Sequence, residues 1–502
     1  MARRNRREVL TKRSSGRAPV LTVACRNGFA VPEIMAEVSK RKPQPVALHH
    51  LAWATGIIGL PLSHYWLVAK VEPFYSSIYC FLWWSYIFAV DFAVCRLRGT
   101  SLLRDRPKEL LLLAIWSVPV WMFFEMVNLC IQNWYYVMVP WSFSWGLMFL
   151  VLAFGTVLPA IFETMELVVG LIEKLAPRGR IEGSPLTVSL WNVRIQWGIG
   201  ALMLALLLAF PKSCYCLAWG FAFFLTEPIC YWFRRTEKCQ VGRSLLGQLA
   251  SGDNTRLVAL LASGLICGGL WEAWNVTART KWIYSVPFFD ELKLGEMPLL
   301  GFLGFPPFAL ECYALINFLS LLRRGRNWEL TASENLARHG LPAWGVAASA
   351  VLLPIIILVC GVATAGISVG SVAAPMDYCF RRELGEAGIN ALRLRNVTEG
   401  HQFLQLQERP PEIDAELFAR MRRIVALSEC KGLGIWNARE LEKLNITRLD
   451  ELARGNPVEL ARKLTELGGR VRVEEVKIWI REANRIEARN PSIVTRQIST
   501  RP

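Results

Sequence analysis

The sequence predicts an all-α fold: a polytopic membrane helix bundle of two parallel four-span repeats and one further span, with a small helical C-terminal domain. Three observations predict this fold. Of the 502 residues, 53% are hydrophobic, and 20 Trp and 25 Phe are present, which exceeds the apolar content of an ordinary soluble domain. The apolar residues come in blocks of about 20, the length of a helix that crosses a bilayer. Several of these blocks repeat one pattern of polar residues.

The composition also excludes several classes of protein. Soluble globular enzymes, collagenous chains and disordered chains do not carry apolar blocks of this length. A disulfide scaffold is excluded because the 13 Cys are sparse and no Cys-x-x-Cys pair occurs. Lys and Arg number 57 against 41 Asp and Glu, for a net charge of +16, and we assign this surplus to cytoplasmic loops.

Residues 1–45 are predicted to form a basic N-terminal tail, since Lys and Arg far outnumber Glu there. No apolar run of about 7–15 residues follows closely, so the segment is not a secretory signal. We interpret it as a solvated cytoplasmic tail beside anionic lipid, with a transit peptide as the alternative.

The next part of the chain is predicted to contain nine membrane spans. Lys and Arg gather in the second, fourth, sixth and eighth connections between the spans. The positive-inside rule therefore places these connections and the N-terminus in the cytoplasm. Nine spans would leave the C-terminus on the opposite side. The predicted spans are about 49–69, 76–96, 109–131, 142–170, 189–211, 213–233, 255–278, 298–322 and 344–371.

The first eight spans divide into two units that share one plan. Glu125 and Glu272 are each followed by Asn three residues later and by Pro fifteen residues later. A second carboxyl, Glu163 or Glu311, follows a proline in the last span of each unit. Four spans per unit give both units the same orientation, as in a parallel repeat about an axis along the membrane normal. The units are residues 46–180 and 181–330, and the last span lies in residues 331–375.

The polar residues shared by the two units are candidates for a catalytic site. A carboxyl in the bilayer core costs about 2.5–3.5 kcal/mol on insertion scales, so it normally faces the bundle interior and has a partner. An Asn three residues after a Glu lies on the same helix face and can orient the carboxyl or hold its proton. Proline breaks in membrane helices line cavities or the protein interior. The candidate catalytic residues are Glu125, Asn128, Glu163, Glu272, Asn275 and Glu311.

Aromatic side chains follow each Glu–Asn pair, and we expect them at the rim of a two-fold pseudo-symmetric cavity. The candidate substrate-binding residues are Trp134, Tyr135, Trp282 and Tyr284. An interfacial aromatic belt is the alternative for these four, and interhelical hydrogen bonding is the alternative for the carboxyls. No metal site and no cofactor are predicted, because the five His lack ligand spacing and no glycine-rich nucleotide motif occurs.

The segment 271–315 resembles the small integral-membrane lycopene cyclase (carotenoid cyclase) domain. The matching residues, in order, are Trp271-Glu272, Trp282, Tyr284, Gly304-Phe305-Pro306 and Glu311. The family's adjacent acid pair after Pro is absent here, and each unit has four spans instead of three. The resemblance implies redox-neutral acid–base chemistry on an isoprenoid, with membrane carboxyls as proton donors. In this interpretation Glu272 is the acid and Glu311 the base, while the first unit is degenerate or structural.

Residues 376–502 are predicted to form a helical domain with a segment, 424–464, that resembles a helix-hairpin-helix module. Gly432 and Gly434 would form the hairpin, where open backbone angles and close approach require glycine. A related half-motif lies at 384–397. In that family the hairpin amides bind a nucleic-acid phosphate, and other such modules bind only proteins, so both partners remain open.

Three functions are compatible with these patterns. An integral-membrane enzyme doing acid–base chemistry on an isoprenoid or lipid would have a closed cavity that opens sideways to lipid. A transporter or channel would have a water path, broken helices and a carboxylate-lined site. A membrane anchor for the hairpin module is the third function. The expected partners are the lipid bilayer, a hydrophobic small-molecule substrate, and a protein or nucleic acid at the C-terminal module.

Overall fold

The computed structural model describes residues 46–236, 244–288, 292–322, 327–330 and 371–489. Those from His49 onward belong to one compact unit. The predicted N-terminal tail lies outside the described residues, as does all but the last residue of the predicted ninth span.

Within the described residues, seven helices are long and apolar enough to cross a membrane, and a pair bent by 41° makes up to eight. They coincide with the first eight predicted spans, so the chain has the helices of a multi-pass membrane protein. The bent pair is Pro211–Ala218 with Phe221–Trp232. The seven are Leu48–Ala69, Tyr75–Arg98, Pro107–Ile131, Phe143–Leu175, Leu190–Ala209, Thr255–Thr277 and Leu299–Leu321.

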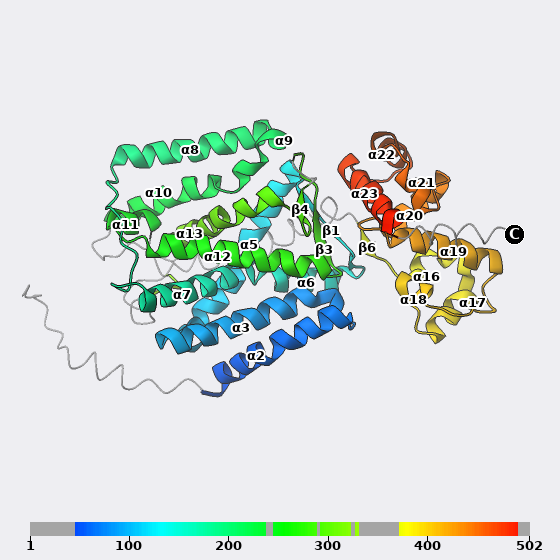
Figure 1. Cartoon of the computed structure of the whole chain (residues 1–502), viewed down its shortest axis with the longest axis horizontal. Coiled ribbons are helices and arrows are strands. Elements are labelled where there is room, and N and C mark those ends of the chain that lie inside the picture. Colours follow the sequence, from blue (N-terminus) through cyan, green and yellow to red (C-terminus); the bar gives the residue numbers. More distant parts are fainter. Residues whose placement is uncertain (1–45, 237–243, 289–291, 323–326, 331–370, 490–502) are drawn as a thin grey trace, which may run out of the picture. The chain divides into compact units, whose positions relative to one another are not determined.

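The long helices of the membrane part lie side by side (Figure 1). Six of the helices pack one on the next across the bundle, in the order α3, α7, α12, α13, α10 and α8. Helix α5 packs against α7. The helices of the membrane part are α2 (Val46–Ala69), α3 (Ile78–Arg98), α5 (Pro107–Ile131), α6 (Phe143–Phe154), α7 (Val157–Leu175), α8 (Leu190–Ala209), α10 (Phe221–Thr236), α12 (Thr255–Thr277) and α13 (Phe305–Leu322). The short helices between them are η1 (Tyr75–Ser77), α4 (Leu102–Asp105), α9 (Pro211–Cys214), η2 (Tyr215–Ala218), α11 (Leu245–Ala250) and η3 (Leu299–Gly304).

Small residues allow the closest of these helix contacts. A Cβ added at Gly264 would lie 2.4 Å from the carbonyl oxygen of Phe305, and one at Gly268 would lie 2.1 Å from the Phe305 ring. The backbone of α12 therefore approaches α13 as closely as small residues permit in membrane bundles. The core around this contact is rich in aromatic side chains, including the buried Trp83 and Phe308.

The two ends of the bundle differ in chemistry. At the end where α12 begins, which we call the basic end, Arg98 pairs with Glu166 and Arg256 pairs with Glu329. At the opposite end, β1 (Trp134–Val137) follows α5 and β3 (Lys281–Tyr284) follows α12. These two strands pair antiparallel, with Trp134 opposite Tyr284 and Tyr136 opposite Trp282. We call this pair the ribbon.

The strands are a difference from the all-helical expectation. Besides the ribbon, the described residues include the parallel pair β2 (Val139–Pro140) with β6 (Val372–Ala373), and the antiparallel pair β4 (Lys293–Leu294) with β5 (Met297–Pro298). Their physical origin is local. Helices α5 and α12 end on the same side of the bundle, and the unpaired backbone of the segments that follow them finds hydrogen-bond partners in each other.

The C-terminal domain, yellow to red in Figure 1, is a cluster of short helices around its own apolar core. Two stretches repeat one local geometry. Gly385 and Gly434 have φ of 59° and 69°, and Asn396 and Asn445 have φ of 54° and 60°. The helices are α16 (Met376–Cys379), α17 (Arg381–Leu394), α18 (Gly400–Leu404), α19 (Ala415–Ser428), α20 (Gly434–Lys443), α21 (Leu449–Ala453), α22 (Pro457–Glu466) and α23 (Val473–Arg489).

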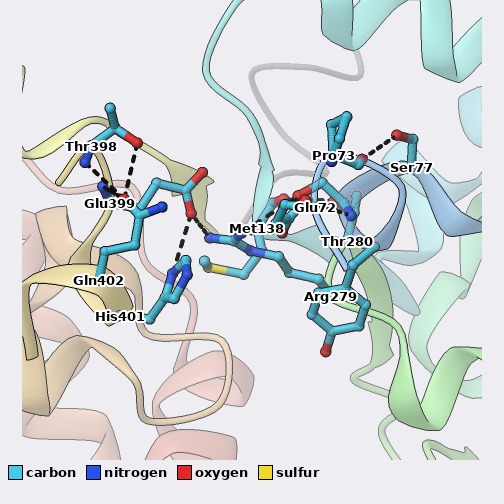
Figure 2. Close-up of polar contacts among 12 residues, drawn as sticks. Glu72, Pro73, Ser77, Met138, Arg279, Thr280, Thr398, Glu399, His401 and Gln402 are labelled. Carbon is cyan, nitrogen blue, oxygen red and sulfur yellow. Dashed lines mark hydrogen bonds and ion pairs between the residues drawn. The ribbon is translucent and has the colours of Figure 1, made fainter. Parts of the chain in front are cut away.

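Charged contacts join the C-terminal domain to the ribbon end of the membrane part. Figure 2 shows Arg279, just before β3, between Glu72 and Glu399. Its guanidinium donates to Glu72 at 2.6 Å and also contacts Glu399, while the His401 ring lies 3.4 Å from Glu399. Burial lowers the pKa of Arg279, but the Glu399 and Glu72 carboxylates outweigh it and raise the pKa above its ordinary value. A second pair, Lys431 with Glu296 at 2.5 Å, lies at the same end.

Candidate functional site

The ribbon presents different side chains on its two faces. Side chains alternate along a strand, so Trp134, Tyr136, Trp282 and Tyr284 share one face. The opposite face carries Tyr135, Val137 and Ile283, which cluster with Ile478 of α23 in the C-terminal domain. The ribbon therefore separates an aromatic site in the membrane part from the C-terminal domain.

Glu125 is the most heavily hydrogen-bonded carboxyl at the aromatic face. It lies near the end of α5 and is 1% exposed. Its Oε1 accepts from the Trp121 ring nitrogen at 2.9 Å, the Trp134 ring nitrogen at 3.1 Å and the Tyr136 hydroxyl at 2.5 Å. Burial, followed by the neighbouring Glu125, raises the pKa of the Tyr136 phenol well above its usual range, so this phenol stays a donor. The Oε2 of Glu125 is buried and has no hydrogen-bond partner.

Glu272 occupies a similar position near the end of α12, where it is 3% exposed. Its Oε1 accepts from the Tyr284 hydroxyl at 2.9 Å, and its Oε2 has no hydrogen-bond partner. Burial and the nearby Glu272 likewise raise the pKa of Tyr284 well above its usual range. Each half of the bundle thus holds one buried Glu–Tyr pair at the ribbon.

The two asparagines fix the backbone of the ribbon. Asn128 donates to the Trp134 carbonyl at 2.9 Å and accepts from the amides of Asn133 and Trp134. Asn275 donates to the Trp282 carbonyl at 2.9 Å and accepts from the Trp282 amide at 3.1 Å. Both are almost fully buried, so each asparagine satisfies backbone groups that have no access to water.

A cavity of about 830 Å³ lies against the aromatic face of the ribbon. Its lining is mostly apolar and aromatic and comes from both halves of the membrane part. Glu125 lines this cavity, whereas the second half contributes Tyr284 but not Glu272. A large apolar cavity with a few fixed polar groups is the usual form of a small-molecule site. The aromatic lining includes Tyr79, Trp83, Trp121, Trp134, Tyr136, Trp219, Trp271, Trp282, Tyr284 and Phe308.

No protein-family model, curated protein or solved structure matches this chain. The function is therefore argued from the site itself.

The remaining two candidate carboxyls lie away from the cavity lining. Glu311 is fully buried in α13, and its Oε1 accepts from the Ala222 amide at 2.9 Å, at the start of α10. Glu163 is fully buried in α7 near Asp91 and Arg106. Glu125 therefore lines the cavity, whereas Glu311 binds a backbone amide at the start of α10.

The other predicted site residues are divided by the ribbon. Trp134, Trp282 and Tyr284 line the cavity, but Tyr135 faces the C-terminal domain, where Arg472 lies over its ring at 5.3 Å. The hairpin glycines also lie at this interface. A Cβ at Gly432 would be 3.2 Å from Ile283, and one at Gly434 would be 2.6 Å from Ser371.

Sequence reasoning missed Tyr136 and Trp121, which share Glu125 with Trp134. A signal for Tyr136 was present. Trp134 and Tyr136 are two residues apart, as are Trp282 and Tyr284, and this spacing places each pair on one face of a strand. Within the described residues, no group of three or more His, Cys, Asp or Glu side chains is arranged to hold a metal ion.

Proposed function

We propose that the protein is an integral-membrane enzyme that performs acid–base chemistry on an isoprenoid or another lipid in the aromatic cavity. The observation that carries the proposal is a buried, hydrogen-bonded carboxyl, Glu125, in the wall of a large apolar cavity. Its second oxygen has no partner and is available to a bound molecule. A dry site of this kind strengthens electrostatic interactions and excludes competing water.

The proposed chemistry divides roles between carboxyl and phenol. Glu125, held by three donors, exchanges a proton with the substrate, and Tyr136 orients it and maintains its hydrogen bond. The faces of Trp121, Trp134 and Trp219 surround the site and suit an electron-poor carbon skeleton. Glu272 and Tyr284 form the second such pair, in which Tyr284 lines the cavity and Glu272 lies behind it. The lycopene cyclase resemblance implies the same class of chemistry, but it points to Glu272 and Glu311, whereas this proposal assigns the proton exchange to Glu125.

We further propose that the two halves are a parallel duplication. Equivalent contacts support it beyond the Glu–Tyr and Asn–backbone pairs. In α3 the Asp91 carboxylate accepts the Leu103 amide at 2.8 Å, and in α10 the Glu227 carboxylate accepts the Leu246 amide at 2.9 Å. Both amides belong to a short helix after the span, α4 or α11. Recurrence of such an unusual contact at matching places is what an internal repeat predicts.

The test compares lipid extracts from membranes that contain the wild-type protein, Glu125→Gln or Glu173→Gln. Redox-neutral acid–base chemistry forms isomers of equal mass, so chromatographic separation must precede mass spectrometry. We expect an isoprenoid or lipid isomer that depends on the protein and disappears with Glu125→Gln. Glu173→Gln is the control, because this residue pairs with Arg98 at the basic end. An unchanged lipid profile for wild type against empty membranes would refute the enzyme.

A transporter is the second candidate, favoured by the broken span before α10. The chain there bends by 41°, and Glu311 binds an amide at the break. Broken helices of this kind form binding sites in secondary transporters. Solute uptake into proteoliposomes together with an unchanged lipid profile would select this function.

For the C-terminal module, we propose that its hairpin binds this chain's own ribbon and not nucleic acid. Gly432 and Gly434 lie against Ile283 and Ser371, so a phosphate at the hairpin would compete with that contact. Retention of the full-length protein on duplex DNA, falling steeply with salt, would contradict this assignment.

A further inference from the structure

Three aromatic rings from separate parts of the chain gather at the ribbon end. Trp141 follows β2, Tyr378 belongs to α16, and Trp436 belongs to α20. The ring centres of Trp141 and Tyr378 are 4.3 Å apart, those of Tyr378 and Trp436 5.8 Å, and those of Trp141 and Trp436 6.4 Å. The three residues are 40%, 50% and 39% exposed, in the order Trp141, Tyr378, Trp436. We call them the aromatic triad.

The position of Trp141 fixes the triad at the level of the membrane surface. Trp141 lies two residues before Phe143, the first residue of a helix that is apolar and long enough to cross the membrane. Phe143 and Trp145, on the first turn of that helix, are 56% and 58% exposed. Side chains this apolar at the start of a span face lipid, so the boundary of the hydrocarbon region passes close to Trp141. Trp and Tyr are enriched at this depth because one end of the ring is apolar and the other polar.

Two further contacts hold the C-terminal domain at this level. On one side, β2 pairs with β6, and Ser371 accepts hydrogen bonds from the amides of Met138 and Val139. On the other side, Arg279 joins Glu72 to Glu399, as Figure 2 shows. The β2–β6 pair and the ion pairs of Arg279 together hold Tyr378 and Trp436 beside Trp141.

We propose that the C-terminal domain rests on the lipid surface through Tyr378 and Trp436, which extend the aromatic belt of the membrane part onto the soluble domain. The partner is the interfacial layer of the bilayer at the ribbon end. The assignment depends on continuity with the lipid-facing start of α6, where Phe143 and Trp145 are exposed beside Trp141. Trp141 and Phe143 also line the cavity, so the lipid contact lies beside the cavity wall.

The test places a photo-crosslinking residue, benzoyl-phenylalanine, at 378 or 436 in the full-length protein. The protein is reconstituted in vesicles of phosphatidylcholine and phosphatidylglycerol, irradiated and analysed by mass spectrometry. We expect lipid adducts at both positions. The control position is Val458 on α22, which is 62% exposed in the same domain, and we expect at least ten-fold less adduct there.

Two outcomes overturn the proposal. Equal lipid adducts at 378, 436 and 458 would mean random collision with vesicles. Adducts at 378 or 436 that join two protein chains, with no lipid attached, would assign the triad to contact between copies.

The proposal is independent of the chemistry in the cavity. Lipid adducts at 378 and 436 together with an unchanged lipid profile would retain the surface contact and remove only the proposed enzyme.

Discussion

The two halves of the membrane part carry the same Glu–x–x–Asn pattern, yet they place the carboxyl differently relative to the cavity. Glu125 lines the cavity and receives three hydrogen bonds on one oxygen, whereas Glu272 is set behind Tyr284. The ribbon explains how this arises. Both strands begin six residues after the asparagine, but Trp134 is the first residue of β1, whereas Trp282 is the second residue of β3. One sequence pattern can therefore place a carboxyl either in the wall of a cavity or behind another side chain.

The largest expected effect is a difference in product formation between variants of the two carboxyls, Glu125 and Glu272. Glu125→Gln should reduce formation of the lipid product by about 10²–10⁴-fold, the usual contribution of general acid–base catalysis. Glu272→Gln should reduce it less, because Glu272 does not line the cavity. Product formation per amount of folded protein is the measurement. The sequence pattern alone favours the opposite order, so a larger loss with Glu272→Gln would assign the acid to the second half.

The second prediction compares the two asparagines. Asn128→Ala should lower the free energy of unfolding by about 1–3 kcal/mol, because buried backbone groups of Asn133 and Trp134 lose their partner. Asn275→Ala should cost less, since it removes two hydrogen bonds, both to Trp282. Thermal unfolding in detergent measures both variants. Asn192→Ala, at an exposed site on α8, is the control and should stay within about 0.5 kcal/mol of wild type.

The third prediction compares the two glycines of the C-terminal domain that share one backbone geometry. Gly385 and Gly434 both have positive φ, so alanine costs about 1–3 kcal/mol of strain at either position. A Cβ at Gly385 would meet open space, but one at Gly434 would clash with Ser371. Gly434→Ala should therefore also loosen the domain from the membrane part. Limited proteolysis between the two parts should accelerate for this variant only, and equal acceleration for both would contradict the contact.

The smallest expected effect is a weakening of the contact between the C-terminal domain and the membrane part at acid pH. Burial raises the pKa of Glu399, but His401 and Arg279 outweigh it and hold the pKa below its ordinary value. A depressed carboxyl pKa stabilises the folded arrangement fully above the unfolded value of about 4.3, and this contribution is lost as pH falls through the folded pKa. An ion pair of this kind is worth about 1 kcal/mol or less.

The same proteolysis assay measures this dependence. Cleavage between the two parts should be constant from about pH 8 to 5 and rise below about pH 4. Glu399→Gln should remove the acid-dependent part. An acid-dependent rise that persists unchanged in Glu399→Gln would contradict this assignment.

The helices of the membrane part could be predicted from the sequence because a bilayer imposes a length on apolar segments. The first eight expected spans agree with the helices within a few residues. The burial of Glu125 and Asn128 among hydrogen-bond partners was also expected, because polar groups in spans are costly and normally have partners.

The ribbon could not be predicted in the same way. Each strand has four residues, too few for a periodic signal, and Trp134 pairs with a residue far along the chain, Tyr284. The repeated spacing of Trp and Tyr favours Tyr136 on the face of Trp134, but only the pairing shows which face of the strand meets the cavity. The role of Asn275 depended on the same fact, since a turn into a strand offers backbone groups that a continuing helix does not.

The ribbon is a wall only one strand layer thick, with the cavity on one side and α23 on the other. A molecule that fills the cavity presses on Trp134 and Tyr136, whose backbone carries Tyr135 toward Ile478. Binding free energies coupled through a shared wall are reciprocal. If an occupant of the cavity strengthens the contact between the C-terminal domain and the membrane part, that contact strengthens the binding of the occupant by the same free energy.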